Sequence, residues 1–146
     1  MSKLFIYYSV SGNGDFVAKK LEERGFDLRK VESKLKLSKN IILCMLKGGF
    51  KSLVSAKPKL INFDIDISNY DEIYVGSPIW NARLAAPTNT VLDELDFSNK
   101  KLTFVLYSGS GSGKKALKKL NKKYPDAKVI FLKQPKNNEE EIKKVE

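Results

Sequence analysis

The chain has 146 residues, 42% of them hydrophobic and 30% charged, which predicts a folded protein with one core and excludes a disordered chain. It has no histidine and one cysteine, which excludes Ser-His-Asp and Cys-His catalysis, most zinc sites and an intramolecular disulfide. The formal charge of +10 favours an anionic partner but does not choose among a nucleotide cofactor, nucleic acid and an acidic protein. We therefore expect any chemistry to belong to a bound cofactor.

The chain begins with an apolar run, Leu4–Tyr8, that we interpret as a buried strand because no small-residue cleavage site follows it. Apolar residues at helical spacing over 17–21 predict a helix, and Gly25 is placed to end it. The alternation over Phe26–Val31 then predicts an edge strand that is wetter than the first.

The middle of the chain is harder to interpret. Asn40–Phe50 is typical of a helix, and Lys51–Asn69 of a long irregular connection. Ile73–Val75 predicts a buried strand. A further helix is indicated by the apolar spacing over 91–95, with Pro87 suited to its first turn.

Two more strands and two more helices are expected toward the end of the chain. Leu102–Tyr107 and Val129–Leu132 predict buried strands, and the apolar spacing over 116–124 predicts a helix between them that Pro125 ends. Asn138 is suited to cap a final helix. Favourable i, i+4 ion pairs are expected in that helix, Glu139 with Lys143 and Glu140 with Lys144.

Strand and helix thus alternate along the chain, which predicts an α/β fold with a parallel sheet covered by helices on both faces. We find no internal repeat and no domain boundary, and expect one domain over 1–146 without a membrane-spanning segment. In such sheets ligands bind beyond the carboxyl ends of the strands, so the segments after the strands are the candidate sites.

The segment after the first strand can hold a phosphate without any cationic side chain. Its glycines allow a close approach, its hydroxyls can donate, and the following helix begins with free N–H groups and a partial positive charge. An ordinary strand-to-helix turn with a serine cap is the alternative. The residues are Ser9, Val10, Ser11, Gly12, Asn13 and Gly14.

Two further segments follow later strands. Residues 76–87, expected as a loop, carry the chain's one tryptophan, which can stack on a flat ligand or can simply cover the core. Residues 108–113 alternate Ser and Gly, which suits close backbone contact with a ligand; a flexible linker is the alternative.

Together, these stretches resemble flavodoxins over nearly the whole chain. The resemblance is carried by YYSVSGNGDFVAKKL at 7–21, YDEIYVGSPIWNARLAAPTNTVLDEL at 70–95 and LYSGSGSGKKALKKL at 106–120. It implies a three-layer, doubly wound, five-stranded parallel sheet with strand order 2-1-3-4-5. It also implies FMN as cofactor, with the phosphate on residues 9–14. The ring would lie between two groups, Ser77, Pro78, Ile79, Trp80 and Asn81 on one side and Ser108, Gly109, Ser110 and Gly111 on the other.

The resemblance implies an electron carrier that shuttles electrons between cytoplasmic redox partners, with no catalytic residue of its own. Three features depart from the family pattern: Gly14 stands where Thr or Ser is usual, Asp15 brings a negative charge near the phosphate, and the chain is basic where many flavodoxins are acidic. The basic charge suggests acidic redox partners.

Two alternatives stay open. The same fold serves NAD(P)H-dependent FMN or quinone reductases, although we find no motif for a nicotinamide site, and whether the chain is itself an enzyme is left undecided. The second alternative is a binding module, a protein of the same fold that has lost FMN. Nucleic acid is the less favoured partner for such a module. A dinucleotide fingerprint fits poorly, because Val17 occupies its third glycine position.

Overall fold

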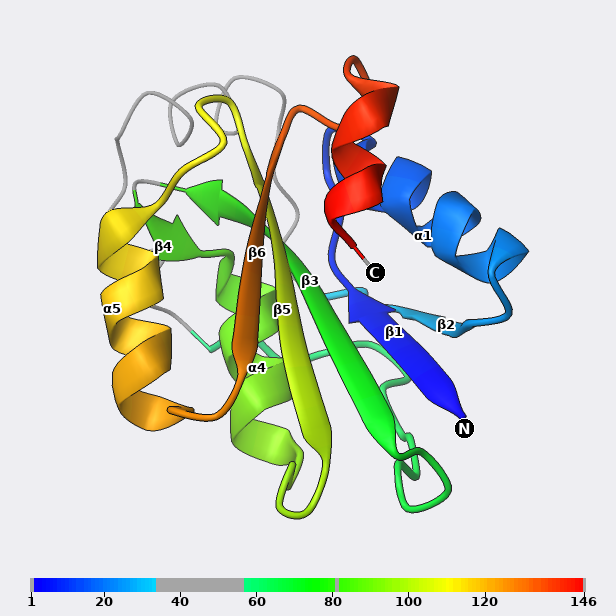
Figure 1. Ribbon diagram of the computed structural model, residues 1–146. Coiled ribbons are helices and arrows are strands. Elements are labelled where there is room, and N and C mark those ends of the chain that lie inside the picture. Colours follow the sequence, from blue (N-terminus) through cyan, green and yellow to red (C-terminus); the bar gives the residue numbers. More distant parts are fainter. Residues whose placement is uncertain (1, 34–56, 81, 146) are drawn as a thin grey trace.

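The computed structural model describes residues 2–33, 57–80 and 82–145. The helix expected at 40–50, with Cys44 inside it, lies outside these residues. No helix in the described part of the chain is both long and apolar enough to cross a membrane. The elements, labelled in Figure 1, are β1 (Lys3–Tyr7), α1 (Asn13–Glu23), β2 (Asp27–Lys30), β3 (Glu72–Trp80), β4 (Arg83–Leu84), α4 (Ala86–Glu94), β5 (Lys101–Ser108), α5 (Lys114–Lys123), β6 (Lys128–Lys133) and the 3₁₀ helix η1 (Glu139–Lys144).

The sheet confirms the expected fold class and strand order. Its strands run in the order β2-β1-β3-β5-β6 and are all parallel. This is the predicted order 2-1-3-4-5, because the short β4 was not predicted and shifts the numbers of the last two strands by one. β4 stands outside this path and pairs antiparallel with the end of β3. The order reverses between β1 and β3, the point where ligands bind in sheets of this kind.

β3 is longer than expected, and this corrects the prediction of a loop from residue 76 onward. The strand continues through Gly76 to Trp80, paired with β5 as far as Pro78 opposite Tyr107. Proline interrupts most central strands because it cannot donate a ladder hydrogen bond. Here β1 has already ended at Tyr7, opposite Gly76, so no neighbour on that side needs a donor from Pro78.

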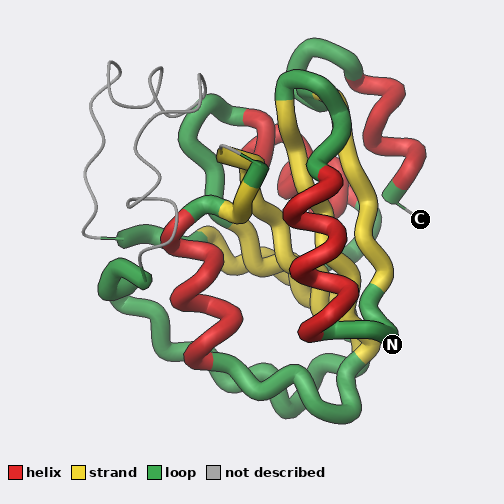
Figure 2. Tube along the Cα trace, turned by 90° about the vertical axis from the view of Figure 1, so that its left-hand side faces the viewer, coloured by secondary structure: helices red, strands yellow, loops and turns green. Residues whose placement is uncertain are grey.

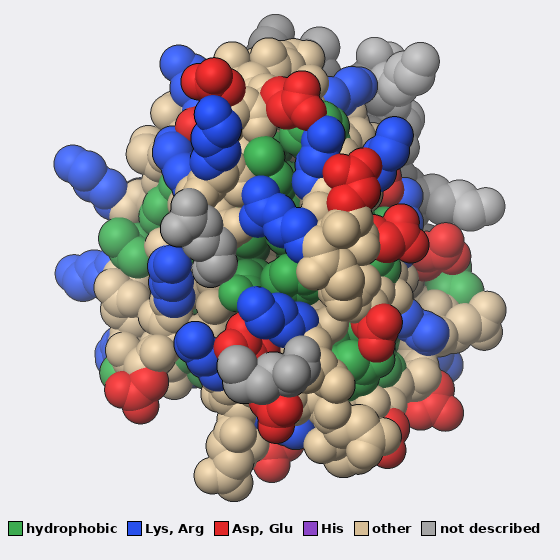
Figure 3. Space-filling view, turned by 45° about the vertical axis from the view of Figure 1, so that its right-hand side comes forward, with side chains coloured by type: hydrophobic (Ala, Val, Ile, Leu, Met, Phe, Trp, Pro, Cys, Tyr) green, Lys and Arg blue, Asp and Glu red, His purple; other side chains and the backbone are tan. Residues whose placement is uncertain are grey.

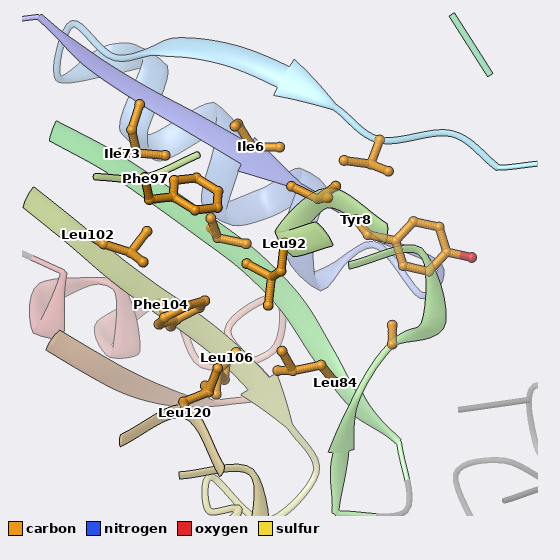
Figure 4. Packing of buried hydrophobic residues seen from close by; sticks show 14 of the residues in the cluster. Ile6, Tyr8, Ile73, Leu84, Leu92, Phe97, Leu102, Phe104, Leu106 and Leu120 are labelled. Atoms are coloured by element: carbon orange, nitrogen blue, oxygen red, sulfur yellow. The ribbon is translucent and has the colours of Figure 1, made fainter. Parts of the chain in front are cut away.

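Alternating side chains of the strands build two cores, one on each face of the sheet. Leu4, Ile6, Phe104 and Leu106 belong to the core beneath α4 and α5, part of which is drawn in Figure 4. Their neighbours Phe5, Tyr7, Val105 and Tyr107 belong to the core beneath α1 and η1. Figures 1 and 2 show the resulting three layers, helices on both sides of the sheet. The period of two along each strand therefore produces the doubly covered sheet.

The helix ends follow the sequence signals at α1 and α4. α1 gives way to Gly25, whose φ of 89° is a left-handed conformation that a glycine adopts at little cost. α4 has Pro87 in its first turn, as expected.

The final helix differs from the expectation in its cap and its ion pairs. It is a 3₁₀ helix, and the amide of Asn138 donates backward to the Lys133 carbonyl at 3.0 Å instead of capping. Side chains three residues apart lie above one another in a 3₁₀ helix, so i, i+3 pairs replace the expected i, i+4 pairs. The pairs formed are Lys143 with Glu140 at 3.9 Å and Lys144 with Glu141 at 2.7 Å.

η1 is joined to α1 by charged side chains. Glu139 pairs with Lys20 of α1 at 2.7 Å. Arg24, just beyond the end of α1, donates to the carbonyls of Ile142, at 3.5 Å, and Val145. These contacts hold the segment that follows β6 against the helix that follows β1, although β1 and β6 are not neighbours in the sheet.

Candidate anion-binding site

The segment between β1 and α1 presents unpaired backbone donors. Among the described residues, no acceptor pairs with the N–H groups of the four residues from Val10 to Asn13. Gly12 has a φ of 95°, a left-handed conformation between residues of ordinary conformation. Successive N–H groups around such a residue form a concave anion site, and the start of α1 adds a partial positive charge. We call residues 10–13 the nest.

Ser9 supports the start of α1. Its Oγ accepts hydrogen bonds from the backbone N–H groups of Gly14 at 3.1 Å and of Asp15 at 3.3 Å. Ser9 thus provides an acceptor for the first turn of α1, as a capping serine does, although the N-cap residue itself is Gly12 and makes no side-chain cap. Ser11 is exposed, and its Oγ accepts a hydrogen bond from the Asn13 amide at 3.3 Å. The hydroxyl oxygens of Ser9 and Ser11 act as acceptors in these bonds, so the hydrogen of each hydroxyl can still be donated to an anion, beside the backbone N–H groups.

The structure brings a lysine to the nest that the sequence analysis did not identify. The backbone N–H of Lys136 donates to Oδ1 of Asn13 at 3.1 Å. The ammonium of Lys136 donates to the Ser11 carbonyl at 3.4 Å, and it lies 3.3 Å from the place of a Cβ on Gly12. The segment between β1 and α1 has no cationic residue of its own, but Lys136 brings a positive charge to it.

Asp15 does not leave an uncompensated negative charge beside the nest. Its carboxylate pairs at 2.7 Å with Lys30, the last residue of β2. This hydrogen bond raises the pKa of the Lys30 ammonium above its ordinary value. Figure 3 shows acidic and basic side chains intermixed over the face that carries α1 and η1. An anion at the nest meets little net repulsion from this acidic residue.

The segment after β5 is held by its own hydroxyls and by the end of β6. Ser108 Oγ accepts from the N–H of Gly111 at 2.9 Å, and Gly111 has a φ of 74°. Ser110 and Ser112 share a hydrogen bond at 3.1 Å. The amide of Gln134 donates to the Gly109 carbonyl at 3.3 Å, so the turn after β6 contacts this loop as well as the nest. The loop is ordered by these bonds and is not a free linker.

The segment at the end of β3 is mostly buried. Ser77 is fully buried, and its Oγ accepts from the Ala85 N–H at 3.1 Å, which fixes the approach to α4. Pro78 is buried and Ile79 is half-buried. Trp80 is 1% exposed, with its ring edge-on to Tyr8 at 5.8 Å between centroids. The indole therefore belongs to the core in this arrangement. Asn81 lies outside the described residues.

All three predicted segments lie at one edge of the sheet, the edge where the parallel strands end. Tyr7 is level with Gly76, and Pro78 with Tyr107, so the segments after β1 and β5 and the end of β3 lie side by side. Ser108 is level with Lys133, which brings the turn after β6 to the same edge. The rule that ligands bind beyond the ends of parallel strands points to residues 134–138 as well. Applying it to the last strand would have suggested Lys136.

This arrangement suits a ligand with two parts. The nest, with Lys136 beside it, suits a phosphate ester, because it offers several N–H donors and one cation. Farther along the same edge, Ile79 offers half-buried apolar surface, and residues 108–112 offer polar backbone groups. No cluster of three or more acidic, histidine or cysteine side chains able to hold a metal is found among the described residues.

Comparison with known proteins shows both family and fold. A family model described as flavodoxin matches residues 2–144. The fold is similar to a Bacteroides eggerthii protein at 21% identity, covering 94% of each chain with a TM-score of 0.72. It is similar to a Lactobacillus acidophilus flavoprotein crystallised with FMN at 23% identity, covering 95% of this chain and 97% of that one, with a TM-score of 0.67.

The apo-form of a flavoprotein from Lactobacillus acidophilus, solved by NMR, is 25% identical, with 88% of each chain covered and a TM-score of 0.64. Among curated proteins, none has a significantly matching sequence. The family match covers almost the entire chain. This chain belongs to the flavodoxin family.

Proposed function

We propose that this chain binds FMN at the edge formed by the nest and the segments after β3 and β5, and that it carries electrons between cytoplasmic redox proteins. The observation that carries the proposal is the run of four N–H groups in the nest that have no acceptor among the described residues, at the same edge as the other two segments. Family membership and the FMN complex of a fold neighbour support the choice of mononucleotide.

The phosphate end of FMN fits the residues present. A terminal phosphate has three acceptor oxygens, and the nest supplies N–H donors together with the Ser11 hydroxyl. Gly12 adds no side chain to the nest, and a Cβ there would crowd the Lys136 side chain at 3.3–3.6 Å. Riboflavin without its phosphate lacks the group that this cradle fits.

The ring end fits through loop backbone more than through an exposed aromatic side chain. The space beside Gly109 is open: the nearest atom to a Cβ placed there would be in the Gln134 side chain, at 3.7 Å. A flat ligand can therefore approach the backbone of Gly109. Ile79 is half-buried at the same edge and offers apolar contact. Trp80 and Ser77 are buried, and we propose that they shape the edge from beneath.

When bound, FMN supplies the redox chemistry by accepting and donating electrons. The protein's own residues hold the phosphate, orient the ring and set the surrounding charge. With a formal charge of +10, the chain favours negative charge on a bound ligand more than an acidic homologue would. We therefore propose a redox potential for bound FMN that is less negative than in acidic flavodoxins.

The helix α5 provides a surface for an acidic partner. Its ten residues include six lysines and no acidic residue. Four of them, Lys115, Lys119, Lys122 and Lys123, border a groove of about 700 Å³ between α4 and α5, whose apolar lining includes Leu84, Leu92 and Leu120. A basic rim around an apolar floor suits an acidic protein, whose approach it would also accelerate by steering. The groove extends to β4, the strand paired with the end of β3.

FMN binding is tested by adding FMN to the apoprotein and recording flavin absorption, fluorescence quenching and affinity. Gly12→Ala is the informative variant, because it puts a side chain into the nest at a φ of 95°. Gly25→Ala is its matched control: the φ of 89° imposes a similar backbone strain, but nothing lies within 4 Å, and Gly25 lies beyond the opposite end of α1 from the nest.

We expect Gly12→Ala to weaken FMN binding at least tenfold and Gly25→Ala to leave it unchanged, with both variants losing some stability. A wild-type protein that stays colourless with FMN would favour the binding-module alternative. NADPH oxidation with excess quinone, catalysed by the FMN-loaded protein alone, would favour a reductase over a carrier.

A further inference from the structure

We propose that Lys136 is the residue that neutralises the phosphate of the bound mononucleotide, supplied by the turn after β6 to a nest that has no cation of its own. The inference rests on the proposed FMN binding and adds a residue to it. It assigns a ligand-binding role to a segment that follows the last strand, far in sequence from the phosphate loop.

The position of Lys136 is fixed by two contacts with the nest. Its backbone N–H donates to the Asn13 side chain at 3.1 Å, which ties the turn to the first residue of α1. Its ammonium donates to the Ser11 carbonyl at 3.4 Å. The charge therefore lies beside Gly12, whose left-handed conformation is typical of a backbone anion site.

The charge of Lys136 is available for a ligand. Among the described residues, its ammonium forms no salt bridge, and its one hydrogen bond goes to a neutral carbonyl. Two cations of α1 and β2 have carboxylate partners, Lys20 with Glu139 and Lys30 with Asp15, both at 2.7 Å. Lys136, by contrast, has no carboxylate partner in the described part of the chain.

The turn that carries Lys136 is anchored on both sides. Before it, the Gln134 N–H donates to the Ser108 carbonyl at 3.0 Å. After it, the Asn138 amide donates to the Lys133 carbonyl at 3.0 Å, and Glu139 reaches α1. Because both ends are held, little conformational entropy of the backbone remains to be lost when the ammonium meets a phosphate.

The same turn explains how a loop with weakened donors can still hold a phosphate. Gly14 lacks the hydroxyl that flavodoxins usually carry there, which leaves the loop one side-chain donor short. One charge-assisted hydrogen bond is stronger than a neutral one by about twofold. Lys136 is positioned to make such a bond.

The test compares FMN and riboflavin binding to the apoproteins of wild type and Lys136→Met. Methionine removes the ammonium but keeps the backbone N–H that donates to Asn13. We expect FMN binding to weaken about tenfold at low salt and riboflavin binding to stay within twofold. Lys136→Arg should restore most of the loss. Lys118→Met, which removes an exposed lysine of α5, is the matched control for net charge and should change neither affinity.

Salt gives a second readout that does not depend on redox activity. The FMN affinity of wild type should fall with ionic strength more steeply than that of Lys136→Met, because the ion pair is screened. Equal FMN affinities and equal salt slopes in the two proteins would overturn the role of Lys136 while leaving FMN binding intact. Failure of wild type to bind FMN would instead overturn the proposed function itself.

Discussion

The Tyr107 hydroxyl lies where a side chain on Gly14 would begin. A Cβ built on Gly14 would clash with the hydroxyl oxygen and would stand 2.7 Å from the Cβ of Ser9. Tyr107 is 3% exposed, and its hydroxyl donates to the carbonyl of Tyr8. Burial raises the pKa of Tyr107 well above its ordinary value of 10.0, so the phenol stays protonated and remains a donor. Glycine at this position therefore has a packing cause.

Gly14→Ala should destabilise the protein by about 1–3 kcal/mol, because the new methyl group overpacks a filled site. Tyr107→Phe in the same chain should recover part of this loss, since it removes the atom nearest the methyl group. Thermal unfolding of the two single variants and the double variant measures the coupling. Gly109→Ala is the control, with no atom within 3.7 Å of the new Cβ, and should change stability by less than about 0.5 kcal/mol. A Gly14→Ala protein as stable as wild type would contradict the packing argument.

Ser9→Ala should lower the stability of the apoprotein by about 1 kcal/mol, because two N–H groups at the start of α1 lose their acceptor. Ser11→Ala should cost less, since the Ser11 hydroxyl accepts from one exposed side chain only. Urea unfolding of the apoproteins separates the two variants. If Ser9 acted only as a phosphate ligand, its removal would leave the apoprotein's midpoint unchanged.

Lys30→Met should weaken FMN binding by about twofold to threefold and leave riboflavin binding unchanged. In wild type the Lys30 ammonium lies 2.7 Å from the Asp15 carboxylate and neutralises it, whereas in the variant the carboxylate repels the phosphate. The expected effect is small because both side chains are exposed to solvent. The double variant Asp15→Asn with Lys30→Met should regain wild-type affinity, as measured by FMN fluorescence titration. Equal affinities for wild type and Lys30→Met would mean that Asp15 is too far from the phosphate to matter.

The order of strands and helices could be predicted because each element carries its own local signal. Leu4–Tyr8 and Leu102–Tyr107 are short apolar runs that match β1 and β5, and the helix after residue 13 ends at its glycine as expected. The segment after Val75 could not be predicted correctly from local signals. Gly, Ser and Pro indicate a turn, but pairing with β5 and the early end of β1 allow the strand to continue.

The residues that complete the nest depend on contacts between distant parts of the chain. Lys136 and Asn13 are 123 positions apart in the sequence, and no local pattern connects them. Asn138 illustrates the same limit. The local sequence predicts that it caps the final helix, but its side-chain amide donates back to the carbonyl of Lys133. Trp80, the most conspicuous candidate for stacking, packs edge-on against Tyr8 in the core beneath α4 and α5. Strict alternation along β3 would instead place it on the face of Tyr74, so its position could not be predicted from the strand pattern.

The contact between η1 and α1 should depend on pH through Glu139. Its hydrogen bond with Lys20 lowers the pKa of the Glu139 carboxyl below the ordinary value of 4.5 and raises the pKa of Lys20 above 10.5. A lowered carboxyl pKa stabilises the contact above about pH 4.5 and loses that effect as pH falls through the folded-state pKa. A raised lysine pKa stabilises it below about pH 10.5 and loses that effect as pH rises through the folded-state pKa.

An NMR titration of the Glu139 side-chain carboxyl should therefore show a midpoint below the ordinary value, and Lys20→Met should move the midpoint back toward it. The glutamate stays exposed, so the change should be seen in the titration more clearly than in global stability. Identical Glu139 midpoints in the two proteins would show that the ion pair does not persist in solution.

Charge reversal on α5 should slow electron transfer with an acidic redox protein without changing FMN affinity. Lys119→Glu combined with Lys123→Glu turns two rim residues of the α4–α5 groove acidic, on the opposite face of the sheet from α1. Steered association depends on such charges, so we expect the second-order rate constant to fall about tenfold at low salt and to approach the wild-type value at high salt. Stopped-flow reduction of an acidic ferredoxin-type acceptor measures this rate constant.

The control reverses Lys143 and Lys144 on η1, which leaves the net charge equal to that of the test variant, and should slow the reaction less. Equal slowing by both pairs would mean that total charge, rather than the α5 surface, governs the encounter.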